Sequence, residues 1–227
     1  MKPILCYVTD GRSLAARARG AAPDRVALLV QRVRRAVDAG VDWVQVREKD
    51  MDGGALASLA RECIAAVGSG STRIIVNDRL DVAVACGAHG VHLGGESLPV
   101  RDVVSWIRGG RSQSPEAPQP AGTFLVGRSC HSPEEARAAE ADGASYIVFG
   151  PVFSTPSKQQ FGPPQGLERI AGVCRASRIP VIAIGGITAE KAAECIRVGA
   201  SGIAAIRLFQ ESDDLPALVG AIRRPAS

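Results

Sequence analysis

The sequence predicts an α/β fold of the (β/α)8 TIM-barrel type, on three observations. Short apolar runs rich in β-branched residues alternate with Ala- and Arg-rich helical patterns, which predicts parallel strands joined by helices. Eight such pairs occur in 227 residues, close to the roughly 250 residues of a typical barrel. A Gly-containing segment also recurs before every second strand.

The elements are assigned from these patterns in chain order. Strands are predicted at residues 4–9, 43–47, 73–77, 90–93, 124–127, 146–149, 181–184 and 202–206. Helices are predicted at residues 25–39, 53–67, 79–86, 99–108, 132–142, 166–176, 188–198 and 213–223. An open doubly wound sheet is the alternative fold, and the lack of a Gly-rich dinucleotide fingerprint after the first strand disfavours it.

The recurring segment reads AGVDW, CGAHG, DGASY and VGASG, and it begins at residues 39, 86, 142 and 198. Each copy places a Gly where a helix ends and a left-handed cap is favoured, and a strand starts about three residues later. The copies precede the second, fourth, sixth and eighth strands. The chain therefore repeats every two βα units, as expected for a barrel built from quarters.

We expect one domain spanning residues 1–227. The stretch 109–122 is rich in Gly, Pro and Ser and precedes the fifth strand, so it is interpreted as a flexible insertion on the face away from the chemistry. Residues 10–24 follow the first strand on the opposite face and carry several charged side chains. They form either part of a lid or a plain solvated loop.

Composition restricts the class of partner. The net charge of +4 is spread along the chain and only 4% of the residues are aromatic, so nucleic acid is not expected, and small phosphorylated substrates fit the charge equally well. No apolar run is long enough to cross a bilayer, and the chain opens directly into a strand, so we expect a cytoplasmic protein without a membrane partner. Six cysteines without CxxC spacing indicate buried free thiols. A homo-oligomer is an open alternative, because the sequence does not reveal the oligomeric state.

The end of the second strand carries a cationic group of side chains. Alternation places Gln45, Arg47 and Lys49 on one face of the chain. An Arg fork and a Lys point charge at the carboxyl end of a barrel strand suit a diphosphate or polyphosphate. The alternative is an ion-pair network with acidic neighbours.

The ends of the third and fourth strands carry oxygen ligands. Asn77 and Asp78 can serve Mg²⁺, although Asp78 is equally suited to cap the next helix. Glu96 follows two glycines after the fourth strand and is a second candidate metal ligand. His92 is interpreted as structural.

The fifth strand is followed by Ser129 and His131, two candidate catalytic residues. Ser129 or Ser132 can cap the following helix, with Glu135 completing a capping box from Ser132. Capping accounts for a serine but not for His131, which can transfer a proton near neutral pH.

The sixth, seventh and eighth strands end in candidate anion-binding segments. Hydroxyls at Thr155 and Ser157 followed by Lys158 indicate an anion-binding flap, the alternative being a plain Pro-rich loop. Loops after the last two strands of a barrel commonly bind phosphate through backbone N–H groups. The candidates there are Gly185, Gly186, Ile206 and Arg207, although the glycines could serve only a tight turn.

Seven motifs in order resemble the thiamin-phosphate synthase and thiazole tautomerase superfamily. They are VQVREKD (44–50), VNDR (76–79), GVHLG (90–94), GRSCHS (127–132), YIVFGPVFSTPSK (146–158), VIAIGGI (181–187) and GASGIAA (199–205). The resemblance implies a synthase that joins a pyrimidine diphosphate to a thiazole phosphate, with Mg²⁺ and cations stabilising the departing diphosphate.

The resemblance also implies roles for the candidate residues. Those for pyrimidine diphosphate are Gln45, Arg47 and Lys49, with Asn77 and Asp78 serving diphosphate and Mg²⁺. Those lining both substrates are Ser129, Thr155, Ser157 and Lys158. Those for thiazole phosphate are Gly185, Gly186, Ile206 and Arg207. Lys158, Ser129 and His131 form the expected catalytic group.

Three departures from the family pattern keep alternatives open. Gly95 and Ser97 stand where a Gln and an acidic Mg²⁺ ligand are usual, with Glu96 as the compensating ligand. Arg207 stands where Ser is usual, and the flap continues as QQFGPPQGL. GRSCHS and this flap are more similar to the tautomerase branch, in which His131 would handle the proton shift. A sugar-phosphate isomerase and a non-catalytic phosphate-binding barrel are further alternatives.

Overall fold

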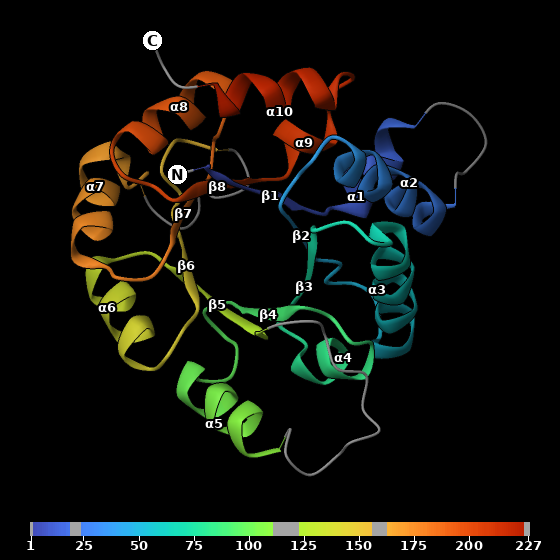
Figure 1. The fold of residues 1–227 in the computed structure, drawn as a ribbon, viewed down its shortest axis with the longest axis horizontal. Helices are drawn as coiled ribbons and strands as arrows, with labels where there is room; N and C mark the ends of the chain where they lie inside the picture. Colours follow the sequence, from blue (N-terminus) through green and yellow to red (C-terminus); the bar gives the residue numbers. More distant parts are fainter. Residues whose placement is uncertain (1, 19–23, 111–122, 156–162, 225–227) are drawn as a thin grey trace.

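The computed structural model describes residues 2–18, 24–110, 123–155 and 163–224, and its strands form one closed parallel barrel (Figure 1). The strands are β1 Ile4–Val8, β2 Trp43–Val46, β3 Arg73–Asn77, β4 Gly90–Leu93, β5 Leu125–Cys130, β6 Tyr146–Phe149, β7 Val181–Ile184 and β8 Gly202–Ala205. Each strand pairs with its sequence neighbours, and β1 closes the ring on β8. The predicted (β/α)8 barrel is therefore confirmed.

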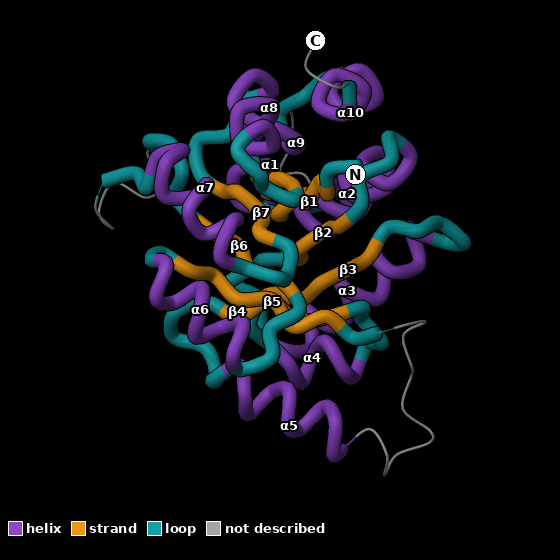
Figure 2. The backbone as a smooth tube through the Cα atoms, turned by 60° about the vertical axis from the view of Figure 1, so that its left-hand side comes forward, coloured by secondary structure: helices purple, strands orange, loops and turns teal. Residues whose placement is uncertain are grey.

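Helices surround the barrel on its outside (Figures 1 and 2). They are α1 Gly11–Arg17, α2 Arg25–Asp38, α3 Gly53–Val67, α4 Leu80–Ala85, α5 Val100–Gly110, α6 Pro133–Ala141, α7 Gly166–Ala176, α8 Ala189–Arg197, α9 Arg207–Gln210 and α10 Leu215–Arg223. Eight match the predicted helices. The short helices α1 and α9 were not predicted; they follow β1 and β8 on the carboxyl-terminal face.

Side-chain caps explain where many of these helices begin. At the N-cap, an oxygen of the side chain accepts a hydrogen bond from a backbone N–H of the first turn, which satisfies a donor that the helix leaves free. The caps of this kind belong to α1, α2, α3, α6, α8 and α10 and are Asp10, Asp24, Asp52, Ser132, Thr188 and Asp214. The segment 10–24, for which the sequence left a lid or a plain loop open, therefore contains a helix from Gly11 to Arg17, capped by Asp10.

The quarter repeat appears in the backbone. Gly40, Gly87, Gly143 and Gly199 all have positive φ, at 86°, 70°, 92° and 105°. Each lies two residues after the last residue of a helix and three residues before the first residue of a strand. This left-handed conformation costs Gly little, and it turns the chain back into the barrel.

Apolar and aromatic side chains fill the interior of the barrel. The buried cluster there contains Cys6, Val8, Trp43, Ile75, Tyr146, Val148, Ile182 and Ala204. The rings of Trp43 and Tyr146 lie 4.7 Å apart, centroid to centroid. A Cβ atom at Gly127 would come within 2.1 Å of Tyr146 Cζ, so the absence of a side chain there makes room for the tyrosine ring.

Strand β5 is longer than predicted. It continues to Cys130, because Ser129 and Cys130 pair with Val148 and Phe149 of β6. Ser129 is therefore a strand residue rather than part of a loop after the strand. This difference moves its hydroxyl onto the regular inward-facing register of the barrel.

The two ends of the described chain meet at the amino-terminal side of the barrel. Asp42 accepts hydrogen bonds from Lys2 Nζ at 3.0 Å, Leu5 N at 2.9 Å and Arg223 Nη2 at 2.9 Å. One carboxylate thus joins the first strand to the last helix. The predicted insertion at residues 109–122 lies, from residue 111 onward, outside the described residues.

Two further expectations concern cysteines and membranes. All six cysteines are free thiols, and five of them are buried, as the sequence predicted. Burial raises the pKa of Cys6, Cys63 and Cys195 to about 12, which keeps these thiols protonated. Among the described helices, none combines the length and the apolar character that a bilayer crossing requires.

Candidate active site

Two amides meet at the carboxyl ends of β2 and β3. Gln45 Nε2 donates a hydrogen bond to Asn77 Oδ1 at 2.8 Å, and Gln45 is only 4% exposed. The pair spans neighbouring strands, with Gln45 opposite Ile75 and Asn77 two residues further along β3. The structure therefore brings together two of the predicted substrate-binding residues.

Asp78 lies directly after β3 in an unusual backbone conformation. Its φ is 68°, the only positive value at a described residue other than Gly, and its N–H donates to His92 O at 2.7 Å. Its carboxylate accepts a hydrogen bond from the hydroxyl of Ser97, which in turn accepts from Gly94 N at 2.6 Å. The carboxylate is thus directed to the loop after β4.

The alternative role for Asp78 as a helix cap is wrong. Helix α4 has Arg79 at its N-cap position, and no side chain caps it. Because Asp78 adopts the left-handed conformation and bonds to Ser97, its carboxylate is not directed at the first turn of α4. The metal-ligand interpretation of this residue remains.

His92, Ser129 and Tyr146 form a buried hydrogen-bonded chain across β4, β5 and β6. His92 Nε2 lies 2.8 Å from Ser129 Oγ, and His92 Nδ1 lies 3.2 Å from the Tyr146 hydroxyl. Burial lowers the pKa of His92 to about 3, and the nearby charges of Arg128 and Arg47 add to this shift. The imidazole is therefore neutral. The interpretation of His92 as structural is consistent with its burial, and its hydrogen bond fixes the position of the Ser129 hydroxyl.

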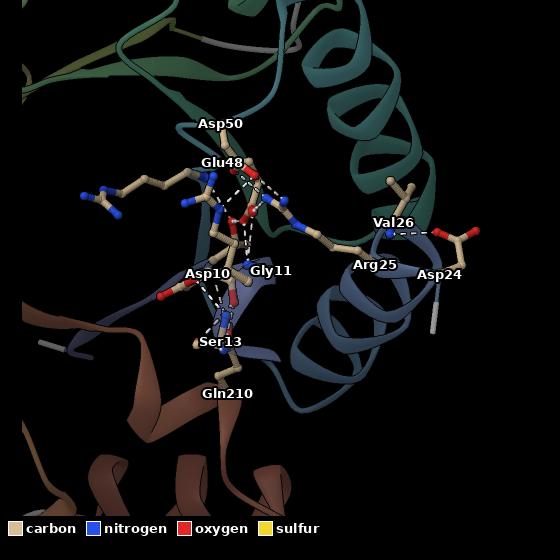
Figure 3. Close-up of polar contacts among 12 residues, drawn as sticks. Asp10, Gly11, Ser13, Asp24, Arg25, Val26, Glu48, Asp50 and Gln210 are labelled. Atoms are coloured by element: carbon tan, nitrogen blue, oxygen red, sulfur yellow. Dashed lines mark hydrogen bonds and ion pairs between the residues drawn. The ribbon is translucent and has the colours of Figure 1, made fainter. Parts of the chain in front are cut away.

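Arg47 and Lys49 are flanked by carboxylates that bind other partners. Glu48 and Asp50 pair with Arg25 (Figure 3). Asp50 also pairs with Arg12. Within the described residues, neither Arg47 nor Lys49 forms an ion pair. The ion-pair network that the sequence offered as the alternative is present, but its acidic members are Glu48 and Asp50, and they pair with Arg25 and Arg12 rather than with Arg47 or Lys49.

The argument that placed Lys49 needs a correction. Strand β2 ends at Val46, and Lys49 lies in an exposed turn closed by a hydrogen bond from Met51 N to Glu48 O at 3.2 Å. Strand alternation therefore does not extend to Lys49. Its position next to Asp50 follows from the turn instead.

The loop after β4 is held by a residue that the sequence reasoning missed. Arg128 on β5 donates from Nη1 to Gly94 O at 2.5 Å and from Nη2 to Gly95 O at 3.4 Å. The signal for it was its position in the GRSCHS motif, one residue before Ser129. Glu96 in the same loop is exposed and makes no hydrogen bond or ion pair within the described part of the chain, so its role as a ligand stays a prediction.

His131 follows β5 and is fixed by two contacts. Its Nδ1 donates a hydrogen bond to the carbonyl oxygen of Gly150, and its backbone N donates to Glu135 Oε2 at 2.7 Å. Because a carbonyl only accepts, Nδ1 carries the proton and Nε2 is the nitrogen left for other chemistry. Ser132 caps α6 as predicted, but Glu135 bonds to His131 N rather than closing the capping box on Ser132.

The loops after β6 and β7 approach each other closely at two glycines. Gly185 and Gly186 have φ of 99° and 65°. A Cβ at Gly186 would lie 2.5 Å from Ser154 O, and one at Gly185 would lie 2.6 Å from Pro151 Cα. The glycines therefore serve close packing between loops and not only a tight turn. Among the described residues, their own amides donate no hydrogen bond.

Some of the remaining predicted site residues lie within the part of the chain that the structure describes, and others do not. Thr155 is buried in the loop after β6, Ile206 is the N-cap residue of α9, and Arg207 is its exposed first residue. Ser157 and Lys158 lie outside the described residues, so the structure places neither. Among described His, Cys, Asp and Glu side chains, no group of three or more is arranged to hold a metal ion.

The structure is a closed (β/α)8 barrel that carries an amide pair, an arginine and a carboxylate at its carboxyl-terminal face. Enzymes with this fold have their active sites at that face, so the fold and the site together define a barrel enzyme. A family model described as thiamine monophosphate synthase matches residues 20–209. The chain belongs to this thiamine monophosphate synthase family.

Relatives and a solved structure agree with this assignment. The thiamine-phosphate synthase of Anaeromyxobacter dehalogenans is 42% identical over 178 residues, covering 78% of this chain and 73% of the relative. That of Methanocella arvoryzae is 40% identical over 184 residues, covering 81% of each. The structure of thiamine phosphate pyrophosphorylase from Pyrococcus furiosus has a TM-score of 0.77 at 29% identity, covering 97% of this chain and 93% of that one.

Proposed function

We propose that this protein is a thiamin-phosphate synthase, a transferase that couples hydroxymethylpyrimidine diphosphate to thiazole phosphate and releases diphosphate. The observation that carries the proposal is the continuous set of polar contacts across the ends of β2 to β5. Gln45 bonds to Asn77, the next residue Asp78 bonds to His92, and His92 bonds to Ser129. These contacts connect candidates for the pyrimidine, the diphosphate and the catalytic group.

The diphosphate half of the reaction is assigned to Arg47 with Lys49. Both side chains are without an ion-pair partner among the described residues, while the neighbouring carboxylates are already neutralised by Arg25 and Arg12. A guanidinium beside a leaving diphosphate stabilises the charge that develops as the bond breaks. Lys158, which lies outside the described residues, is proposed as a further cation and catalytic residue.

The chemistry of the donors at Asp78 fits Mg²⁺ that is shared with substrate. Mg²⁺ in proteins is usually held by one or two carboxylates together with substrate phosphates and waters. Asp78 is exposed and offers one carboxylate, with the Ser97 hydroxyl beside it. We propose Asp78 as the main ligand and Glu96 as a second one. When bound, Mg²⁺ neutralises charge on the diphosphate.

Gln45 is assigned to the pyrimidine diphosphate, Asn77 to its diphosphate group, and Ser129 to the lining of both substrates. Ser129 Oγ is fixed by His92, and Gln45 is fixed by Asn77, so both groups are oriented before substrate arrives. Preorganised polar groups lower the cost of binding because they lose little freedom on association.

The thiazole phosphate is assigned to the other side of the barrel end. The amides of Gly185 and Gly186 and the side chain of Arg207 lie after β7 and β8, where barrels commonly bind phosphate. Thr155, on the loop that packs against those glycines, and Ser157 beyond it are proposed to complete this part together with Ile206.

The test is incubation with both precursors, with and without Mg²⁺, while thiamin phosphate and diphosphate are measured. We expect both products with Mg²⁺, neither with EDTA, and strong loss in Asp78→Ala and Lys158→Ala. Arg207→Ala should raise KM for thiazole phosphate while leaving KM for the pyrimidine diphosphate unchanged. Absence of product under both conditions rejects the synthase assignment.

A thiazole tautomerase is the second candidate, favoured by one observation. His131 is fixed through Nδ1 to Gly150, which leaves Nε2 as the nitrogen able to accept a proton. Tautomerisation needs only proton transfer, so this activity should survive EDTA and fail in His131→Ala. Synthase activity should show the reverse dependence on EDTA.

A further inference from the structure

Glu48 is a buried carboxylate immediately after Arg47, and it is saturated with donors. It is 5% exposed and accepts hydrogen bonds from Thr9 Oγ1 at 2.7 Å and from Gly11 N at 3.1 and 3.0 Å. Arg25 Nη2 donates to it at 2.5 Å (Figure 3). A carboxylate in this state is held by the protein, so its role is to organise its surroundings rather than to bind substrate.

Thr9 connects this carboxylate to the backbone of Arg47. Its hydroxyl donates to Glu48 Oε1, so the oxygen is free to accept from Arg47 N, at 2.9 Å. The backbone N of Thr9 donates to Gln45 O at 2.9 Å. Thr9, at the end of β1 and 1% exposed, therefore holds the chain on both sides of Val46.

A second connection fixes the turn that follows. Arg25 on α2 bridges Glu48 and Asp50, and Arg12 Nε donates to Asp50 at 2.9 Å. The guanidinium of Arg25 holds the pKa of Asp50 well below its ordinary range. Two carboxylates and two guanidinium groups balance in charge, so the cluster leaves the positive charge of Arg47 uncompensated.

We propose that Thr9 and Glu48 are positioning residues that fix the backbone of Arg47 and thereby hold its guanidinium where the diphosphate binds. This inference rests on the proposed function, because it takes Arg47 as the diphosphate ligand. Neither residue touches the reacting atoms. Each acts through Arg47, since the hydroxyl of Thr9 is the link between the Glu48 carboxylate and the Arg47 amide.

The test measures binding of inorganic diphosphate with Mg²⁺ by calorimetry in the full-length chain. Thr9→Val removes the hydroxyl and keeps the shape, and Thr9→Ser keeps the hydroxyl. Thr72→Val is the matched control, because Thr72 is also a buried threonine, and its hydroxyl donates to Val41 O at 2.7 Å before β3, at the other end of the barrel. Thermal unfolding of all three variants reports the purely structural cost.

We expect Thr9→Val to weaken diphosphate binding about five- to tenfold, the equivalent of one lost hydrogen bond at the binding group. Thr9→Ser should recover most of the affinity, and Thr72→Val should lower the melting temperature alone. In turnover, Thr9→Val should raise KM for the pyrimidine diphosphate more than it lowers kcat. If Thr9→Val and Thr72→Val lose stability equally and neither loses diphosphate affinity, the inference is wrong.

Glu48→Asp provides a second variant should Thr9→Val fail to fold, because it keeps the charge and shortens the reach to Thr9. Unchanged diphosphate affinity in Glu48→Asp overturns the inference. A wild-type protein that does not bind diphosphate also overturns it. A wild-type protein that binds diphosphate with this dependence on Thr9 but forms no thiamin phosphate overturns the proposed function and leaves the positioning role supported.

Discussion

His92 Nε2 and Ser129 Oγ lie 2.8 Å apart, on neighbouring strands whose register places His92 opposite Gly127. The histidine is 3% exposed and its other ring nitrogen faces the Tyr146 hydroxyl. The hydroxyl of a candidate catalytic residue is thus attached to the aromatic interior of the barrel. The arrangement leads to the first two predictions.

The first prediction concerns stability against pH. The pKa of His92 falls from an ordinary 6.5 to about 3 on folding, so between these values the unfolded chain binds a proton that the folded chain does not. The contribution of His92 to the free energy of unfolding should therefore be fully present above pH 6.5 and decline as the pH falls, by up to about 1.4 kcal/mol per pH unit.

Urea unfolding at several values between pH 7.5 and pH 4.5 measures this slope. His89, whose pKa is also lowered by burial, contributes in the same direction, so the comparison is between wild type and His92→Gln. The variant should be less stable at pH 7.5 and lose stability less steeply with acid. Equal slopes would exclude His92 as the source.

The second prediction concerns coupling between the same two residues. Ser129→Ala should lower kcat about tenfold, and His92→Gln should lower it less, because it misdirects the hydroxyl without removing it. Residues in direct contact are coupled by about 0.5 to 3 kcal/mol, so the double variant should be scarcely worse than Ser129→Ala. Rate measurements on the four proteins give the coupling, and strictly additive losses would mean that His92 does not act through Ser129.

The third prediction concerns the close approach of two loops. Gly186→Ala places a Cβ 2.5 Å from Ser154 O in a backbone with φ of 65°. Gly166→Ala is the control, because its φ is 74° and no atom of the described residues lies within 4 Å of a Cβ there. The control should lose about 1 to 2 kcal/mol from backbone strain, and Gly186→Ala should lose about 1 to 3 kcal/mol more from the clash. Denaturant unfolding midpoints of the two variants measure these losses of stability. Equal losses in Gly186→Ala and Gly166→Ala would show that the two loops can move apart without cost.

The fourth prediction concerns Ser97, whose hydroxyl bonds to the Asp78 carboxylate. Ser97→Asp places a second carboxylate beside Asp78, so the protein should be less stable without Mg²⁺ and gain a cation site. The Mg²⁺ concentration at half-maximal stabilisation, followed by thermal unfolding, should fall about tenfold relative to wild type. Ser97→Ala is the control and should show no such gain. A Ser97→Asp protein indifferent to Mg²⁺ would contradict the assignment of Asp78 as a ligand.

Much of the fold could be predicted because the sequence signals for its strands and helices involve residues that are close together in the chain. Alternation of apolar strands with helical patterns and the four recurring glycines depend on neighbours in sequence, and all eight strands follow from them. The end of β5 could not be predicted, because Ser129 and Cys130 are small residues without a clear strand pattern. They belong to the strand because they pair with β6. Helix α9 likewise depends on distant contacts, since the side chain of Gln210 bonds to Tyr7 and to Ser13.

The candidate site was predictable to a similar degree and for a related reason. In a parallel barrel every strand ends on the same face, so polar residues after strands could be assigned there without knowing any contact. The partners of those residues could not. The bonds from Thr9 to Glu48 and from Ser129 to His92 join residues 39 and 37 positions apart, and only the strand register brings them together.

The closure of β1 on β8, reinforced where Asp42 joins Leu5 to Arg223, has a consequence for synthesis of the protein. During synthesis on the ribosome, β1 can pair with β2 early. The other edge of β1 has no strand beside it until β8, in the last quarter of the barrel, has been made. Unpaired strand edges are where separate chains pair with each other. Aggregation of nascent chains through this edge is therefore the particular hazard of the architecture, and it ends when the final quarter is complete.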